Sequence, residues 1–455
     1  MKPRRTTVTF RILLLIALIS VAKAQVKSSN SPISIAQSSA ITALKNVRVI
    51  DGTGTSAVEN QTIVIEGTLI RSVGSTTTVT IPEGARTLDL SGRTVLPGLV
   101  MLHEHVHYGT EHAEPLSYPR LFLAFGVTTI RTAGTDHPYF DLNLRRKIAE
   151  GSIPGPEMHV TSQFLNGEGS RYLGDKVVRD AEDARRVVRY WAAEGVTSFK
   201  VHRQISKAAL AAIIDEAHRH GLPVTGHLES VSCREAADLG IDNIEHGFGS
   251  CRSDLGGEGS GNVGAPNVSS REQALIKRLV DSRVVLTVTP FDRDRTLPAR
   301  ELELLHPGTR EKRLRQEQER DRSGKAPGSP SGGHPLTLTF AKAGGRLVLG
   351  SDPGCCGYGR IPGFTNHEAL KVLAQAGFKP LEVIRIATLN GATFLGIQDR
   401  TGSVAAGKEA DLLIVRGDPS QRIEEISNVD MVFANGVVYD PQTLLSAVKG
   451  LVGWQ

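Results

Sequence analysis

Short apolar runs that end in a chemically reactive side chain recur along this sequence. In the clearest case, the apolar residues 95–102 are followed by His103, Glu104 and His105. A continuous apolar run is typical of a strand buried on both faces of a parallel sheet. Because residues i and i+2 of a strand lie on the same face, this strand can present both imidazoles to one point, and Glu104 should point away from it.

Four later apolar runs also end in residues that are able to bind metal ions. They are residues 196–200, 222–227, 241–246 and 347–352, which close with Lys200, His227, His246 and Asp352. Helix-like segments alternate with these runs. In residues 206–219 the apolar positions recur at helical spacing, and Ser206 is a candidate N-cap. This alternation predicts an α/β fold, a (β/α)8 TIM barrel, with its chemistry at the carboxyl ends of the strands.

Shorter β-like runs, separated by Gly, Asn and Asp turns, occupy both ends of the chain. They are residues 44–50, 62–65, 69–73, 411–415 and 431–439. Such spacing is typical of short strands joined by tight turns. We therefore expect residues 41–94 and 403–455 to form one composite β-sandwich, which leaves residues 95–402 for the barrel.

Residues 1–24 have the pattern of a signal peptide. Basic residues precede the apolar residues 12–19, and Ala22-Lys23-Ala24 matches an A-x-A cleavage site. The apolar stretch is too short to span a membrane, so no anchor is expected after cleavage. Residues 25–40 are rich in Ser, Asn and Gln and are expected to form a flexible lead-in. We therefore expect an exported protein, either periplasmic or secreted.

The leader also dominates the net charge of +5. Removing its five basic residues from the total of 53 leaves 48, which equals the 48 acidic residues. A neutral mature chain gives no electrostatic reason to expect a nucleic acid or an acidic membrane surface as partner. The partner expected instead is a small-molecule substrate. The formation of a homo-oligomer is also possible on the sequence alone.

Taken together, these motifs resemble those of the amidohydrolase superfamily over nearly the whole mature chain. Pro97-Gly98-Leu99 precedes the two histidines, and a lysine, two histidines and an aspartate follow in the family's order. Residues 126–131, 387–392 and 402–414 match further family segments. The nearest resemblance is to prolidase-like and other amide-cleaving dipeptidase enzymes, which implies a sandwich flanking the barrel. Met101 departs from the family, where an aspartate that is not usually a ligand commonly stands.

The resemblance implies a centre of two divalent metal ions, with zinc as the expected metal. The implied ligands are His103, His105, Lys200, His227, His246 and Asp352. The first two and the aspartate would hold the more buried ion, and His227 and His246 the more exposed one. A lysine ammonium has no lone pair, so Lys200 can be a ligand only if modified. The resemblance implies carbamylation, which makes it a bridging carboxylate, and the alternative is an ordinary lysine in a salt bridge.

The expected activity is hydrolysis of a C–N amide bond, in a dipeptide or an N-acyl amino acid, by a metal-bridged hydroxide. Asp352 is suited to take a proton from the nucleophile and return it to the leaving nitrogen, although it could serve as a ligand alone. A cyclic-amide hydrolase, a deaminase and a lactonase of the same fold are the alternatives. A non-catalytic binding protein is disfavoured because all six ligand positions are filled.

Several polar residues next to the ligand positions are candidates for binding the substrate. They are His107, Arg131, His202, Arg203 and Tyr358. Each also has an ordinary explanation as a rim or packing residue. Two glycine-rich stretches, residues 254–264 and 323–333, interrupt the barrel pattern. The first follows His246 and is either a mobile lid or a surface insertion.

The four cysteines are Cys233, Cys251, Cys355 and Cys356. The last three follow His246 and Asp352 closely, so they are expected on the catalytic face. In an oxidising compartment, Cys251 could pair with Cys355 or Cys356. Four cysteines allow three complete pairings, and the sequence leaves the choice open.

Overall fold

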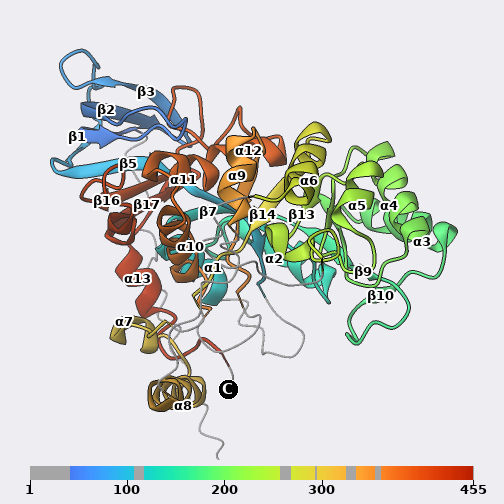
Figure 1. The fold of residues 1–455 in the computed structure, drawn as a ribbon. Helices are drawn as coiled ribbons and strands as arrows, with labels where there is room; N and C mark the ends of the chain where they lie inside the picture. Colours follow the sequence, from blue (N-terminus) through green and yellow to red (C-terminus); the bar gives the residue numbers. More distant parts are fainter. Residues whose placement is uncertain are drawn as a thin grey trace, which may run out of the picture. The chain divides into compact units, whose positions relative to one another are not determined.

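The computed structural model describes residues 41–106, 117–256, 268–292, 295–323, 335–353 and 360–453 (Figure 1). The predicted signal peptide and the lead-in to residue 40 lie outside these residues, as does most of each glycine-rich stretch. Within the described ranges, no helix combines the length and the apolar character needed to cross a membrane.

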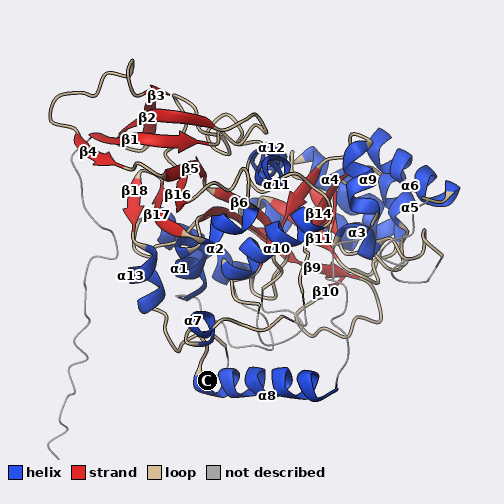
Figure 2. Ribbon diagram, turned by 60° about the vertical axis from the view of Figure 1, so that its left-hand side comes forward, coloured by secondary structure: helices blue, strands red, loops and turns tan. Residues whose placement is uncertain are grey.

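The two ends of the chain meet in one mixed β-sheet, at the left of Figure 2. Its strands are β1 (Ile41–Val49), β2 (Val58–Glu66), β3 (Leu69–Ser75), β4 (Arg86–Asp89), β5 (Arg93–Pro97), β16 (Leu412–Arg416), β17 (Val429–Ala434) and β18 (Val437–Tyr439). The order is β18-β17-β16-β5-β1-β2-β3, with β4 also paired to β1. Strand β1 pairs with β4 over its first half and with β5 near its end, so it belongs to both halves of the sheet.

Both ends of the chain fill the core of this β-structure. Leu44 and Ile63 come from the N-terminal strands, whereas Leu412, Ile414 and Phe433 come from the C-terminal ones, and all five are buried in one cluster. The prediction that the two ends form one β-unit is therefore met, and the predicted sandwich is met in part, because the strands form a single bent sheet rather than two separate ones.

The chain leaves this sheet at Gly98. The sequence pattern placed the boundary after Thr94, but β5 runs to Pro97 and the next strand begins at Leu99. A Cβ at Gly98 would lie 2.1 Å from Thr128 Oγ1, so only glycine lets the neighbouring strand approach this closely. The exact domain ranges stay a prediction.

The remaining strands form two parallel sheets, β6-β7-β8 and β10-β9-β11-β12-β13-β14-β15. They are β6 (Leu99–Glu104), β7 (Val127–Thr132), β8 (Glu157–His159), β9 (Thr161–Asn166), β10 (Lys176–Val177), β11 (Ser198–Val201), β12 (Val224–Gly226), β13 (Asn243–Ile244), β14 (Val285–Val288) and β15 (Leu347–Leu349). Hydrogen bonds link the sheets at both edges. Asp352 N donates to His103 O at 2.9 Å, and Thr161 N donates to Thr132 Oγ1 at 3.0 Å. This arrangement is a TIM-barrel-like α/β fold.

Helices alternate with the parallel strands and pack around them (Figure 1). They are α1 (Ser117–Ala124), α2 (Pro138–Ala149), α3 (Ala181–Ala193), α4 (Lys207–Arg219), α5 (Cys233–Asp238), α6 (Ser270–Asp281), α7 (Ala299–Leu302), α8 (Pro307–Ser323), α9 (Leu336–Lys342), α10 (Phe364–Gln375), α11 (Pro380–Ile386), α12 (Leu389–Leu395) and α13 (Pro441–Ser446), with short 3-10 turns η1 (Gly247–Ser250) and η2 (Ile423–Ser427). The predicted helix over residues 206–219 is confirmed as α4, and Ser206 caps it by accepting a hydrogen bond from Ala209 N.

A disulfide joins Cys233 at the start of α5 to Cys251 after η1. The pairing of Cys251 with Cys355 or Cys356, which the sequence suggested, is therefore wrong, and those two cysteines lie outside the described residues. The physical reason is strand order. Strands β12 and β13 are neighbours, so the segments that follow them emerge side by side and bring the two sulfurs together.

Asp411, which precedes β16, should make the stability of the fold depend on pH. Its buried carboxylate accepts hydrogen bonds from Asn435 N and Thr401 Oγ1. Burial raises its pKa from 3.8 to about 6. Between these values the folded chain binds more protons than the unfolded chain, so this group makes the protein less stable as pH rises from about 4 to about 6.

Asp411→Asn keeps acceptor and donor groups for both partners and removes the titration. The urea midpoint of the variant, relative to the natural chain, should therefore rise over this pH window and stay constant above it. Glu83→Gln, an exposed carboxylate, serves as the control. Parallel midpoint curves for Asp411→Asn and the natural chain would contradict the prediction.

Candidate metal centre

Three predicted ligands from the first and last parallel strands converge on one point. His103 in β6, His105 just after it and Asp352 after β15 are all buried, and their donor atoms lie within 4.8 Å of one another. Asp352 Oδ1 is 3.5 Å from His103 Nε2 and 3.3 Å from His105 Nε2. Two imidazole nitrogens and one carboxylate oxygen facing each other form a donor set suited to a divalent ion such as zinc.

Two more predicted ligands extend this cluster. The ring of His246 lies 4.5 Å from that of His103 and 4.6 Å from that of His227, measured between centroids. His246 Nδ1 shares a hydrogen bond of 2.9 Å with Thr289 Oγ1, which leaves Nε2 as its ligand atom. Burial and the neighbouring cationic groups hold the pKa of His227 and of His246 well below the ordinary value. Both imidazoles are therefore neutral at pH 7, as metal ligands must be.

Lys200 reaches the same interior from β11. Its Nζ lies 3.8 Å from Glu245 Oε1, so the unmodified side chain forms an ion pair, which is the alternative that the sequence left open. Burial lowers the pKa of Lys200 to about 8, against the opposing effect of Glu245. Its carbamylation stays a prediction.

Two ligands adopt left-handed backbone conformations, with φ of 59° at His246 and 50° at Asp352. This region is unfavourable for residues with a Cβ, so the surrounding contacts must hold it in place. At His246 the turn has a clear effect. Successive strand residues normally face opposite ways, whereas here both Glu245 and His246 contact His103.

Glu245 is the functional residue that the sequence reasoning missed. It is fully buried, accepts a hydrogen bond of 2.7 Å from His103 Nδ1 and another of 2.6 Å from Arg131 Nη2. Burial alone would raise its pKa, but Lys200 and Arg131 hold it well below the ordinary value. A carboxylate on Nδ1 fixes the tautomer in which Nε2 is free to bind a metal. The sequence does contain one indication of this role: Glu245 is an acidic residue within the apolar run 241–246, two residues after Asn243.

Two other contacts fix Asp352 in its turn. Glu104 accepts hydrogen bonds from Ser351 N, Ser351 Oγ and Asn366 Nδ2, so it points away from the ligands, as expected from the alternation. Burial raises the pKa of Glu104 to about 7. On the other side, Arg360 Nη1 donates to the backbone oxygens of Ser351 and Asp352 and lies 3.3 Å from Asp352 Oδ2. Asp352 therefore presents Oδ1 to the histidines and Oδ2 to an arginine that no sequence pattern indicated.

The candidates for substrate binding are placed differently from one another. Arg131 is fully buried beneath the histidines and donates to Leu102 O, Asn243 Oδ1 and Glu245 Oε1, so this geometry gives no support to a role in binding substrate. His202 lies beside the cluster, with its ring 5.4 Å from that of His227. Arg203 is paired with Glu229. His107 and Tyr358 lie outside the described residues, and their roles stay predictions.

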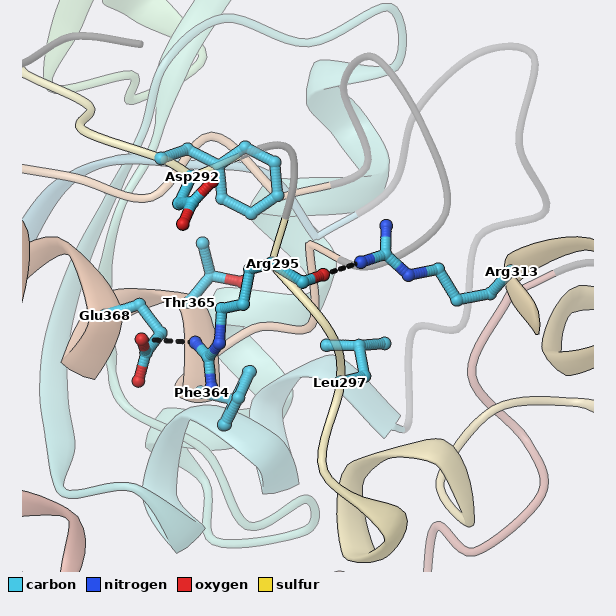
Figure 3. Close-up of a pocket in the computed structure, with 8 residues that line it drawn as sticks. Asp292, Arg295, Leu297, Arg313, Phe364, Thr365 and Glu368 are labelled. Atoms are coloured by element: carbon cyan, nitrogen blue, oxygen red, sulfur yellow. Dashed lines mark hydrogen bonds and ion pairs between the residues drawn. The ribbon is translucent and has the colours of Figure 1, made fainter. Parts of the chain in front are cut away.

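A small pocket lies between the segment after β14 and helix α10 (Figure 3). Arg295 forms an ion pair with Glu368 and stacks 4.3 Å from the centre of the Phe364 ring, and Arg313 donates to Arg295 O. The ion pair and the stacking contact of Arg295 therefore join this segment to α10, the helix that supplies Asn366 to Glu104.

Comparisons with known proteins identify a family and a shared fold. Residues 94–439 match the family model described as Amidohydrolase family. The enamidase of Eubacterium barkeri is 23% identical over 390 residues, which cover 82% of this chain and 86% of that protein. A crystal structure of a Xaa-Pro dipeptidase with bound methionine superposes with a TM-score of 0.65 at 20% identity, covering 88% of this chain and all of that one. Molinate hydrolase superposes with a TM-score of 0.67 at 20% identity, covering 88% and 95%. At these identities, the structures show that the fold is shared.

Glu245→Gln tests the support that this residue gives to the centre. The substitution keeps the size of the side chain but removes the charge that orients His103, so zinc affinity should fall about 10- to 100-fold. It also leaves Arg131 buried without its counter-charge, which should cost about 3–5 kcal/mol of stability. Competition with a chelator and urea unfolding measure the two effects, and Glu229→Gln at the rim is the control.

The double variant Arg131→Met with Glu245→Gln separates the two effects. Removing both charges should restore much of the lost stability while zinc affinity stays low. If stability and affinity recover together, Glu245 acts on the metal centre only through the fold.

Proposed function

Because this chain belongs to the amidohydrolase family, we propose that it hydrolyses the C–N amide bond of a dipeptide or an N-acyl amino acid. The observation that carries the proposal is the convergence of His103 Nε2 and His105 Nε2 on Asp352 Oδ1, deep in the fold. The family and this ligand group together indicate a metal-dependent hydrolase of carbon–nitrogen bonds.

The proposed centre contains two zinc ions. His103, His105 and Asp352 would hold one, His227 and His246 the other, and a carbamylated Lys200 would bridge them. The proximity of the four imidazoles and the burial of Lys200 support this arrangement. Bound zinc supplies Lewis acidity to the substrate carbonyl and makes water a stronger acid.

Asp352 moves the proton in the proposed reaction. Its Oδ1 takes a proton from the attacking water as oxygen adds to the carbonyl carbon. The same proton then passes to the nitrogen as the C–N bond breaks, giving a carboxylic acid and an amine. Arg360 holds Oδ2, so only Oδ1 turns toward the reacting groups. Glu245 keeps His103 Nε2 directed to the centre, and Glu104 keeps Ser351 in place.

A cyclic-amide hydrolase, a deaminase and a lactonase remain alternatives that use the same centre. A panel of dipeptides, N-acyl amino acids, cyclic amides, amino-substituted bases and lactones, assayed on zinc-loaded protein, separates them. The proposal requires the highest kcat/KM on a linear amide.

We also propose that the protein is exported and cleaved after Ala24. The Cys233–Cys251 disulfide supports this, because disulfides persist in oxidising compartments. N-terminal sequencing of protein from its native host checks the cleavage site.

Lys200→Ala tests the bridge. The natural mature protein should carry close to two zinc ions per chain by elemental analysis, and the variant should carry fewer. A short-chain carboxylic acid should restore the lost ion, because it supplies the carboxylate that the carbamate would provide. Full occupancy of the variant without added acid would exclude the bridging role.

Asp352→Asn tests the proton transfer. The amide keeps the size and much of the coordination but cannot accept the proton, so amide turnover should fall about 10²- to 10⁴-fold while the fold persists. Activated esters need little protonation of their leaving group, so their hydrolysis should fall less. Equal losses on both substrates would show that Asp352 serves only as a ligand.

A further inference from the structure

One aromatic ring in the mouth of the site has no part in the metal centre. Phe164 lies on β9 in register with Lys200 of β11, so both side chains face the same side of the sheet. Its ring lies between the rings of His105, at 6.3 Å, and His202, at 5.2 Å. It is only partly buried, unlike Lys200 and His105 beside it.

The position of this ring is fixed by the backbone beside it. A Cβ at Gly134 would lie 2.5 Å from Phe164 Cε1, so the ring packs closely against a glycine that leaves room for it. The same Cβ would lie 2.9 Å from Lys200 Cγ, so the ring and the aliphatic part of the lysine side chain both pack against Gly134. The phenyl group therefore presents a preformed apolar surface next to the ligands.

A second aromatic ring continues this surface outward. Tyr172 lies 5.3 Å from His202 between ring centroids, and about half of it is exposed, at 49%. Its loop is held by hydrogen bonds rather than by burial. Tyr172 N donates to Ser170 Oγ, and Ser170 Oγ and Asn166 Nδ2 both donate to Asp175 Oδ2. An exposed ring kept in place in this way is suited to contact with a ligand.

The charged groups next to His202, whose ring contacts both of these rings, have partners. The Asp175 carboxylate is buried and bonded to Ser170, Asn166 and His202, and Arg203 is paired with Glu229. The ring of His202 contacts both Phe164 and Tyr172, so the three rings form one continuous surface. A surface of this kind favours an uncharged, apolar group over a charged one.

Strand order indicates which part of an amide this surface meets. Asp352 follows β15, and in the proposed reaction it must reach the leaving nitrogen. The amine part of the substrate therefore points toward β15. Strand β9 lies in the other direction from the ligands of β6, beyond β7 and β8. The acyl part is the one directed toward Phe164.

We propose that Phe164 and Tyr172 form a subsite for an apolar acyl group, aromatic or branched aliphatic, on the substrate amide. This inference rests on the proposed amide hydrolysis and names its substrate class. The substrate lays its acyl side chain along Phe164 and, if long enough, reaches Tyr172, while its carbonyl lies at the histidines.

Two substrates with one amine part test the subsite. With N-phenylacetyl and N-acetyl forms of the same amino acid, kcat/KM should favour the phenylacetyl form. Phe164→Ala should lower kcat/KM for that form about 10-fold or more, mainly through KM, and change the acetyl form less than about 2-fold. Tyr172→Ala should give a smaller loss in the same direction.

Two further variants control for folding and for loss of any exposed ring. Phe164→Leu keeps an apolar side chain and should recover much of the preference. Tyr139→Ala removes a similarly exposed tyrosine on α2, away from the centre, and should change neither substrate. Equal losses on both substrates in Phe164→Ala, or no loss in either aromatic variant, would overturn the proposal.

Binding of the acyl products separates this proposal from the proposed function. Titration calorimetry should show that the natural protein binds phenylacetate more tightly than acetate, and that Phe164→Ala loses this preference. If no amide is hydrolysed but the preference is present, the proposed function fails and the subsite stands. If amides are hydrolysed and neither kinetics nor binding prefers the apolar group, only the subsite fails.

Discussion

The site depends on one buried ion pair, between Arg131 on β7 and Glu245 after β13. Both side chains are fully buried, and a lone charge at that depth would cost several kcal/mol. Each has polar partners on other strands, so the pair is stable only when those strands are in register. Arg131 Nε also donates to Leu102 O, directly before the first ligand, and Glu245 accepts from that ligand's Nδ1. The strand of the first ligands and the strand before His246 are thereby set relative to each other.

Three buried acids at this end of the fold show how environment divides their roles. Glu104 meets only neutral donors, and burial raises its pKa toward neutrality. Glu245 meets a guanidinium and an ammonium and stays ionised. Asp352 stands among imidazoles that also hold its pKa well below the ordinary value, and its Oδ1 faces His103 and His105. The same carboxyl group thus supplies a structural hydrogen-bond acceptor, an orienting charge and a group for proton transfer.

The sequence predicted the ligands better than it predicted their supports. Residues such as His103 and Lys200 end or nearly end apolar strands, and strand periodicity alone places them on the inner face. The role of Glu245 was not predicted, because strand alternation places only every second residue on the inner face. The left-handed turn at His246 lets two consecutive residues face inward. Arg360 lies outside any periodic segment, and its partners are 8 and 9 residues away in the chain. The Cys233–Cys251 pairing depends on which strands are neighbours, and spacing from the ligands does not contain that information.

The hydrogen bond from Asp352 N to His103 O joins the first strand of the parallel sheets to the segment that follows the last one. The ligand group of two histidines and one aspartate therefore exists only after nearly the whole barrel region has been made and paired. A growing chain contains the two early histidines before the aspartate has been made. This incomplete ligand set cannot select between metal ions during synthesis. If the protein is exported as proposed, it acquires its metal only after it has crossed the membrane and folded.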